Sequence, residues 1–175
     1  MAVTTIAYRH GVMAADTRAY GGREGSIGSK VKIRRLPDGR LIGATSAQVG
    51  AGEAILDWYA AGADVHKTPE GVESDEVGLL VVHPDGRAQV ASGAWTLTGM
   101  LENAYFAVGS GSNYAVAILE FGGTPQQAVE IACKFDSCSG LPVVSLMHGA
   151  PCPSPRHSRR AKWLSWVGRR FKISG

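Results

Sequence analysis

Two neighbouring threonines, Thr4 and Thr5, stand close to the start of this 175-residue chain. A threonine at an N-terminus carries its own general base, because its free α-amine, with a pKa of about 8, can accept the proton of the hydroxyl nucleophile. Such a group is suited to amide hydrolysis. Here Met1-Ala2-Val3 precedes Thr4, and a nitrogen held in a peptide bond cannot act as that base. Taken alone, two β-branched residues are more typical of an ordinary strand.

Other residue types that carry chemistry are scattered along the chain. The five histidines and three cysteines form no C-x-x-C pair and no cluster at metal-ligand spacing, so neither a metal site nor a local histidine triad is predicted. An odd number of cysteines without such spacing is typical of reduced intracellular thiols. We therefore expect a cytoplasmic protein that needs no metal and no organic cofactor.

The charges divide the chain into a body and a tail. Residues 1–148 hold 15 Asp and Glu against 11 Lys and Arg, whereas residues 149–175 hold seven cations and no acid. A mildly acidic body excludes a protein that binds nucleic acid over its whole surface. No apolar run approaches the roughly 20 residues of a membrane span, and no signal peptide opens the chain. We expect one globular domain over 1–148 and a separate basic tail over 149–175.

The body alternates between strand-like and helix-like segments. Strands are predicted at 4–8, 12–17, 30–36, 40–45, 77–83, 87–92, 104–108 and 141–147, with hairpin turns at 9–11, 37–39 and 84–86. Helical spacing predicts helices at 49–61, 113–121 and 124–135, while 20–29 and 63–76 are predicted loops. This order favours two antiparallel sheets with helices outside them, an α+β layered sandwich.

Three segments in this order resemble the proteasome β subunit and the bacterial HslV peptidase. They are Thr4-Thr5-Ile6 with Gly11-Val12-Met13-Ala14-Ala15-Asp16, then Lys32-Ile33 before Pro37-Asp38-Gly39, and then Val108-Gly109-Ser110-Gly111-Ser112-Asn113-Tyr114-Ala115 with Asp136-Ser137-Cys138-Ser139-Gly140. The resemblance covers roughly residues 3–148. It implies the four-layer αββα sandwich of the N-terminal-nucleophile hydrolases. The helix layer would be reduced, because 63–76 is too short for the second helix of the family's usual pair.

The resemblance also implies roles for particular residues. Thr4 would be the nucleophile, Lys32 would lower the pKa of its hydroxyl and amine, and Asp16 would hold Lys32 in place. By the same resemblance Asp136 and Ser139 would orient the α-amine, and Ser110 would complete the hydrogen-bond network. The backbone N–H of Ala47, where relatives carry Gly, would be the oxyanion donor, and Thr45 would line the substrate pocket.

We favour Thr4 over Thr5 as the nucleophile on the register of the first hairpin. Compared with HslV, each arm lacks about two residues, and equal shortening preserves cross-strand pairing. Thr4 and Asp16, at an even separation, are then expected on one face, with Thr5 on the other. Exposure of the Thr4 amine would follow if Val3 were the true start codon, read as Met and then removed. Self-cleaving relatives usually carry Gly before the Thr.

Together these residues predict a threonine-type endopeptidase of the proteasome/HslV kind. By resemblance it would form a homo-oligomeric ring, receive polypeptide substrates from an ATP-dependent unfoldase and bind no nucleic acid. Two alternatives stay open: an inactive structural or assembly subunit in which Thr4 stays capped, and an amidase or acylase acting on small amides.

The tail has two interpretations of its own. Apolar residues including Trp163, Leu164, Val167 and Phe171 recur at helical spacing among cations, as in a basic amphipathic helix that contacts a membrane surface or an acidic partner. The plainer interpretation, which we favour, is an extension without catalytic chemistry, joined by the Pro-rich linker 151–155.

Overall fold

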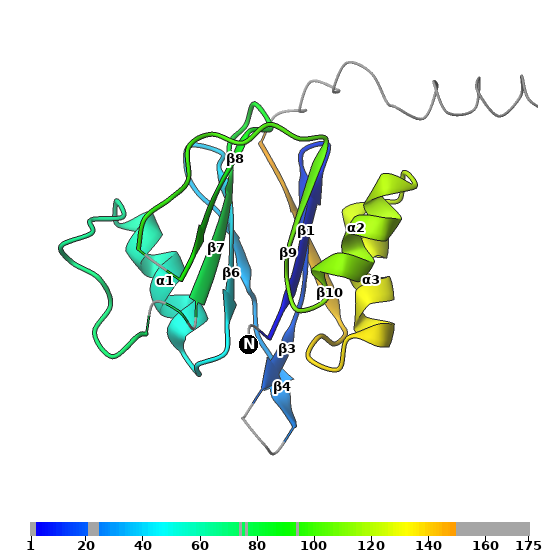
Figure 1. Cartoon of the computed structure of the whole chain (residues 1–175), viewed down its shortest axis with the longest axis horizontal. Helices are drawn as coiled ribbons and strands as arrows, with labels where there is room; N and C mark the ends of the chain where they lie inside the picture. Colours follow the sequence, from blue (N-terminus) through cyan, green and yellow to red (C-terminus); the bar gives the residue numbers. More distant parts are fainter. Residues whose placement is uncertain (1–2, 21–24, 74, 76, 94, 150–175) are drawn as a thin grey trace, which may run out of the picture.

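The computed structural model describes residues 3–20, 25–73, 75, 77–93 and 95–149. The basic tail 150–175 therefore lies outside the described residues, as do Met1 and Ala2. Within the described chain the fold is α+β, as predicted (Figure 1).

Two four-stranded antiparallel sheets face each other (Figure 1). The first has the order β10-β2-β1-β9, from β1 (Thr5–Arg9), β2 (Val12–Asp16), β9 (Tyr105–Gly109) and β10 (Val143–Met147). The second has the order β5-β6-β7-β8, from β5 (Ile33–Arg35), β6 (Leu41–Ser46), β7 (Val77–Val82) and β8 (Ala88–Ser92). All eight correspond to predicted strands, with ends that differ by a few residues.

Helices cover the outer faces of both sheets. Helix α1 (Ala51–Ala60) packs on β6 and β7, while α2 (Ser112–Glu120) and α3 (Pro125–Phe135) pack on β1 and its neighbours (Figure 1). The hydroxyl of the predicted N-cap Thr124 accepts a hydrogen bond from the Gln127 N–H, and the Gln127 side-chain oxygen accepts one from the Thr124 N–H, a complete capping box. The described part of 63–76 contains no α-helix, in agreement with the prediction of a loop there.

Strand alternation sorts the apolar side chains into three core clusters. Ile6 and Tyr8 of β1 point to the second sheet and meet Leu41, Leu80 and other residues between the sheets. The intervening Ala7 faces the other way, with Ala14 of β2, against Leu119, Ala128 and Val129 of the helix pair. Small alanines on that face let the helices approach the sheet closely. A third cluster lies between α1 and the outer face of β6 and β7.

One prediction about the loops is wrong. Residues 20–29 were expected to be a loop, but β3 (Arg18–Tyr20) and β4 (Ser26–Ser29) form a small antiparallel hairpin. All four residues of β4 are exposed. The hairpin therefore has no buried face, and the sequence shows none of the apolar alternation that marks a strand.

Candidate active site

A buried ion pair lies at the end of β2, where the first sheet meets the second. The ammonium of Lys32, whose side chain is 2% exposed, is 3.0 Å from both carboxylate oxygens of the fully buried Asp16. The same carboxylate accepts hydrogen bonds from three backbone N–H groups, which belong to Thr5 (2.9 Å), Arg18 (3.2 Å) and Gly140 (3.0 Å). These bonds fix the carboxylate, which in turn fixes Lys32.

The environment of Lys32 disfavours its charge. Burial lowers the pKa of the Lys32 ammonium, the attraction and hydrogen bonding of Asp16 oppose that effect, and nearby Lys30 adds to the lowering. Besides Asp16, the ammonium donates to the carbonyl oxygen of Val3 at 3.2 Å. Lys32 can therefore stabilise negative charge on an oxygen at the Val3–Thr4 peptide.

That peptide is held on both sides. The Val3 N–H donates to the Ser46 carbonyl at 3.1 Å, and the Thr4 carbonyl accepts from the Ser110 N–H at 2.8 Å. The hydroxyl of Thr4 donates to the Val3 carbonyl oxygen. The Thr4 hydroxyl and the Lys32 ammonium thus both contact the Val3 carbonyl oxygen; a hydroxyl and a cation are among the group types that amide hydrolysis uses.

A second hydrogen-bond chain lies on the other face of β1. The Ser139 hydroxyl and the Ser110 hydroxyl donate to Oδ2 of Asp136 at 2.6 Å and 2.7 Å. The Thr5 hydroxyl lies 2.6 Å from that of Ser139 and was not among the predicted site residues. Strand alternation could have found it, since Thr5 must face away from Thr4. A side chain at Gly111 would come within 2.2 Å of the Thr5 hydroxyl, so this close packing requires glycine there.

The structure brings the six predicted catalytic residues together, but the register argument for Thr4 is wrong. The hairpin pairs Ile6 with Ala15 and Ala7 with Ala14, which puts Thr5 and not Thr4 opposite Asp16. The N–H of Thr5 indeed bonds the Asp16 carboxylate. Residues that pair across a two-residue turn have an odd separation, so the even separation of Thr4 and Asp16 puts them on opposite faces. Thr4 is distinguished by its contacts instead: it lines a small cavity with Lys32, while Thr5 faces α3.

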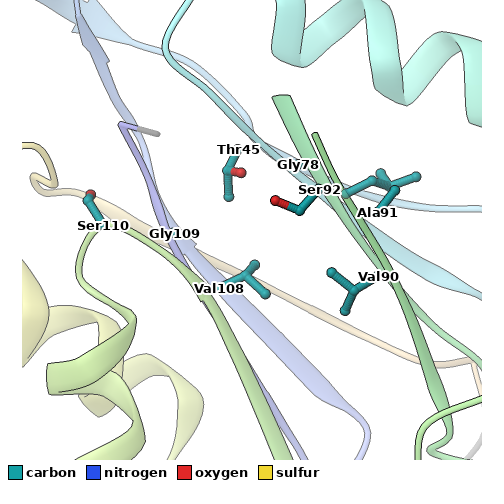
Figure 2. A pocket seen from close by; sticks show the side chains of 9 residues that line it. Thr45, Gly78, Val90, Ala91, Ser92, Val108, Gly109 and Ser110 are labelled. Atoms are coloured by element: carbon teal, nitrogen blue, oxygen red, sulfur yellow. The ribbon is translucent and has the colours of Figure 1, made fainter. Parts of the chain in front are cut away.

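Of the predicted oxyanion residue Ala47 and the predicted pocket residue Thr45, Ala47 alone lines a cavity together with Val3. Ala47 lines, with Val3, a cavity of about 210 Å³ between the β3–β4 hairpin and the start of α1. Thr45 instead lines a cavity of about 420 Å³ between the two sheets, where Figure 2 shows it with Ser92, Val90 and Val108. Alternation along β6 explains the difference, because Ala44 and Ser46 face Thr4 and Thr45 faces the opposite sheet.

The described residues hold no group of three or more His, Cys, Asp or Glu side chains that could bind a metal ion. Among the same residues no helix has the length and apolar character to cross a bilayer.

Comparison with known proteins gives no match to a family model and none to a curated protein. Solved structures do match. BPH from Thiobacillus denitrificans, in complex with epoxomicin, is 22% identical with a TM-score of 0.59 over 85% of this chain and 99% of that one. A second BPH structure from that organism, 22% identical, has a TM-score of 0.58 over 85% and 98% of the two chains. The eukaryotic HslV of Trypanosoma brucei is 18% identical, with a TM-score of 0.56 over 83% and 99%.

The chain has the fold of HslV and BPH. This confirms, at the level of the fold, the proteasome/HslV resemblance that three sequence segments predicted.

Proposed function

We propose that this chain is a threonine-type endopeptidase of the proteasome/HslV kind, with Thr4 as its N-terminal nucleophile. The observation that carries the proposal is the meeting of the Thr4 hydroxyl, the Lys32 ammonium and the Val3 carbonyl, with Lys32 held by the buried Asp16. We classify the fold as the four-layer αββα sandwich of N-terminal-nucleophile hydrolases with a reduced helix layer.

In the proposed reaction the free α-amine of Thr4 takes the proton of its own hydroxyl, and the hydroxyl oxygen attacks the substrate carbonyl. The positive charge of Lys32 favours the deprotonated forms of both groups. The oxyanion is stabilised by the backbone N–H of Ala47, a donor that does not depend on the residue's side chain. The amine proton then passes to the leaving nitrogen, and water hydrolyses the ester on Thr4.

The second hydrogen-bond chain would position the amine. Ser110 contacts both the Thr4 carbonyl and Asp136, so its hydroxyl lies between the nucleophile and a carboxylate. Ser139 extends the same chain to Thr5. We propose that Ser110, Asp136 and Ser139 orient the freed α-amine, and that Thr5 positions them from the neighbouring face.

Catalysis in this scheme requires removal of residues 1–3. The first test is the N-terminal residue and intact mass of the protein made from its native gene, followed by hydrolysis of fluorogenic peptides with Thr4→Ala as the control. A Thr4 terminus with peptide cleavage that epoxomicin inhibits, as its presence on BPH suggests, supports the proposal. A chain that retains Val3 and cleaves nothing refutes it.

A second function is favoured by one feature. Val3 is bound to the Ser46 carbonyl, and its peptide bond blocks the Thr4 nitrogen, as expected of an inactive structural or assembly subunit. Either protein would form a homo-oligomeric ring in the cytoplasm. The peptidase alone would need an ATP-dependent unfoldase to deliver polypeptides. Cleavage of small amides but not peptides would instead indicate an amidase or acylase.

A further inference from the structure

The residue before Thr4 already occupies the position that a substrate residue would take. The carbonyl of Val3 faces the Thr4 hydroxyl and Lys32, and its N–H is bound by the Ser46 carbonyl. Val3 also lines the cavity of about 210 Å³. If the proposed function holds, this cavity receives the side chain on the acyl side of the cleaved bond.

The cavity combines apolar walls with an excess of cationic groups. Its charged lining residues are Arg18, Lys30 and Glu53, two cations against one anion. Lys30 reaches Glu53 at 3.1 Å, with side chains 29% and 47% exposed, so the carboxylate is the more solvent-exposed member of the pair. Nε of Arg18 is buried without a hydrogen-bond partner.

The start of helix α1 adds to this positive character. Val49 and the N-cap Gly50 line the cavity, and no side chain caps the helix. The unpaired N–H groups of a first helical turn carry partial positive charge. Helix end, Lys30 and Arg18 thus surround a space large enough for a side chain, with Glu53 as the opposing charge.

We propose that this pocket selects an acidic residue, Asp or Glu, on the acyl side of the cleaved bond, and that Lys30 is its specificity-determining residue. An incoming carboxylate replaces Glu53 as the partner of Lys30, and Glu53 turns to solvent. A basic side chain meets Lys30, Arg18 and the helix end, with only Glu53 to favour it. A large apolar side chain brings no charge for Lys30, which then keeps Glu53 as its partner.

The first experiment compares fluorogenic peptides that differ only in having Glu, Val or Lys before the cleaved bond. We expect kcat/KM to be at least about fivefold higher for Glu than for Lys, the size of one partly exposed ion pair. Lys30→Glu reverses the order and Glu53→Gln increases the preference for Glu. Arg34→Glu is the matched control, because it makes the same charge change at a residue that pairs with Asp57 outside the cavity. A native preference for Lys or Val, or an equal effect of the Lys30 and Arg34 variants, overturns the inference.

The second experiment does not require activity, because position 3 probes the pocket from within the chain. In the Thr4→Ala protein, which keeps residues 1–3, we expect Val3→Glu to unfold at a temperature about 2–4 °C above Val3→Lys, and Lys30→Glu to reverse that order. If no peptide is cleaved, the proposed function fails while this comparison still decides the pocket's preference. If peptides are cleaved and Val3→Lys is the more stable variant, the function stands and the acidic preference is refuted.

Discussion

Replacement of Asp16 by Asn tests whether the buried ion pair organises the site. Asn keeps the shape of Asp, but its single oxygen can accept only part of the N–H hydrogen bonds made to the two carboxylate oxygens. It also leaves the Lys32 ammonium buried beside a neutral group. Removing one partner of a buried ion pair costs about 3–5 kcal/mol, a large part of the roughly 5–15 kcal/mol that keeps a domain folded. We therefore expect Asp16→Asn to lower the free energy of unfolding by about that amount in urea titrations near pH 7.

The pH dependence of this loss has a definite sign. Burial already lowers the pKa of Lys32 below its ordinary 10.5, and Asp16 is the main group opposing that change, so the variant lowers the pKa further. The cost of burying the charge is complete below the lowered pKa and disappears as the pH rises towards 10.5. The variant should therefore lose more stability at about pH 6 than at about pH 9.5.

A double variant separates charge burial from lost hydrogen bonds. Asp16→Asn with Lys32→Met removes the uncompensated ammonium, so we expect it to recover much of the loss at pH 7 while abolishing peptide cleavage. A free energy of unfolding for Asp16→Asn within about 1 kcal/mol of the native value would show that the ion pair does not organise the site. An equal loss of stability at both pH values would show that the buried Lys32 charge is not its cause.

Three further predictions concern other parts of the domain. His148→Ala should lower the free energy of unfolding in urea by about 2–3 kcal/mol, since the buried ring hydrogen-bonds the Gly39 carbonyl at 2.7 Å and the Tyr8 hydroxyl at 3.2 Å. An unchanged free energy of unfolding would show that these two hydrogen bonds do not stabilise the domain. Burial raises the pKa of Cys133 from 9.0 to about 11, so its stabilising effect, complete below pH 9, is lost as the pH rises through about 11. Iodoacetamide near pH 8.5 should then label it far more slowly in the folded protein than in urea. Thr5→Val should lower kcat far more than it raises KM if Thr5 only positions Ser139, whereas equal effects on both would indicate substrate contact.

The hairpins and helices could be predicted because each has a local signal. Pro37-Asp38-Gly39 and Pro84-Asp85-Gly86 mark turns, β7 is a short continuous apolar run, and Thr124-Pro125 begins α3 as its capping chemistry requires. The β3–β4 hairpin has no such signal, because its exposed strand needs no apolar alternation.

In the candidate site, too, some residues could be predicted from the sequence and others could not. Residue types and order identified Thr4, Asp16 and Lys32 through a family resemblance, yet nothing local shows that Lys32 is buried while Lys30 and Arg34, two residues away on either side, pair with α1 at the surface. That difference depends on the meeting of β2 with the segment before β5. Alternation puts Thr5 on the face opposite Thr4, but its contact with Ser139, 134 positions away in the sequence, has no local signal.

The length of one turn decides which way the side chains of Thr4 and Thr5 face. His10 and Gly11 connect β1 to β2 with φ values of 49° and 81°, the positive-φ conformation of a two-residue hairpin turn. This turn fixes the register that sets the Thr5 N–H against Asp16. It thereby leaves the Thr4 side chain facing the second sheet and Lys32. Because successive side chains alternate, a shift of one residue would turn the Thr4 hydroxyl towards Ser139 and that of Thr5 towards Lys32. The turn at His10-Gly11, far from the site, therefore determines which of two adjacent threonines lies beside Lys32.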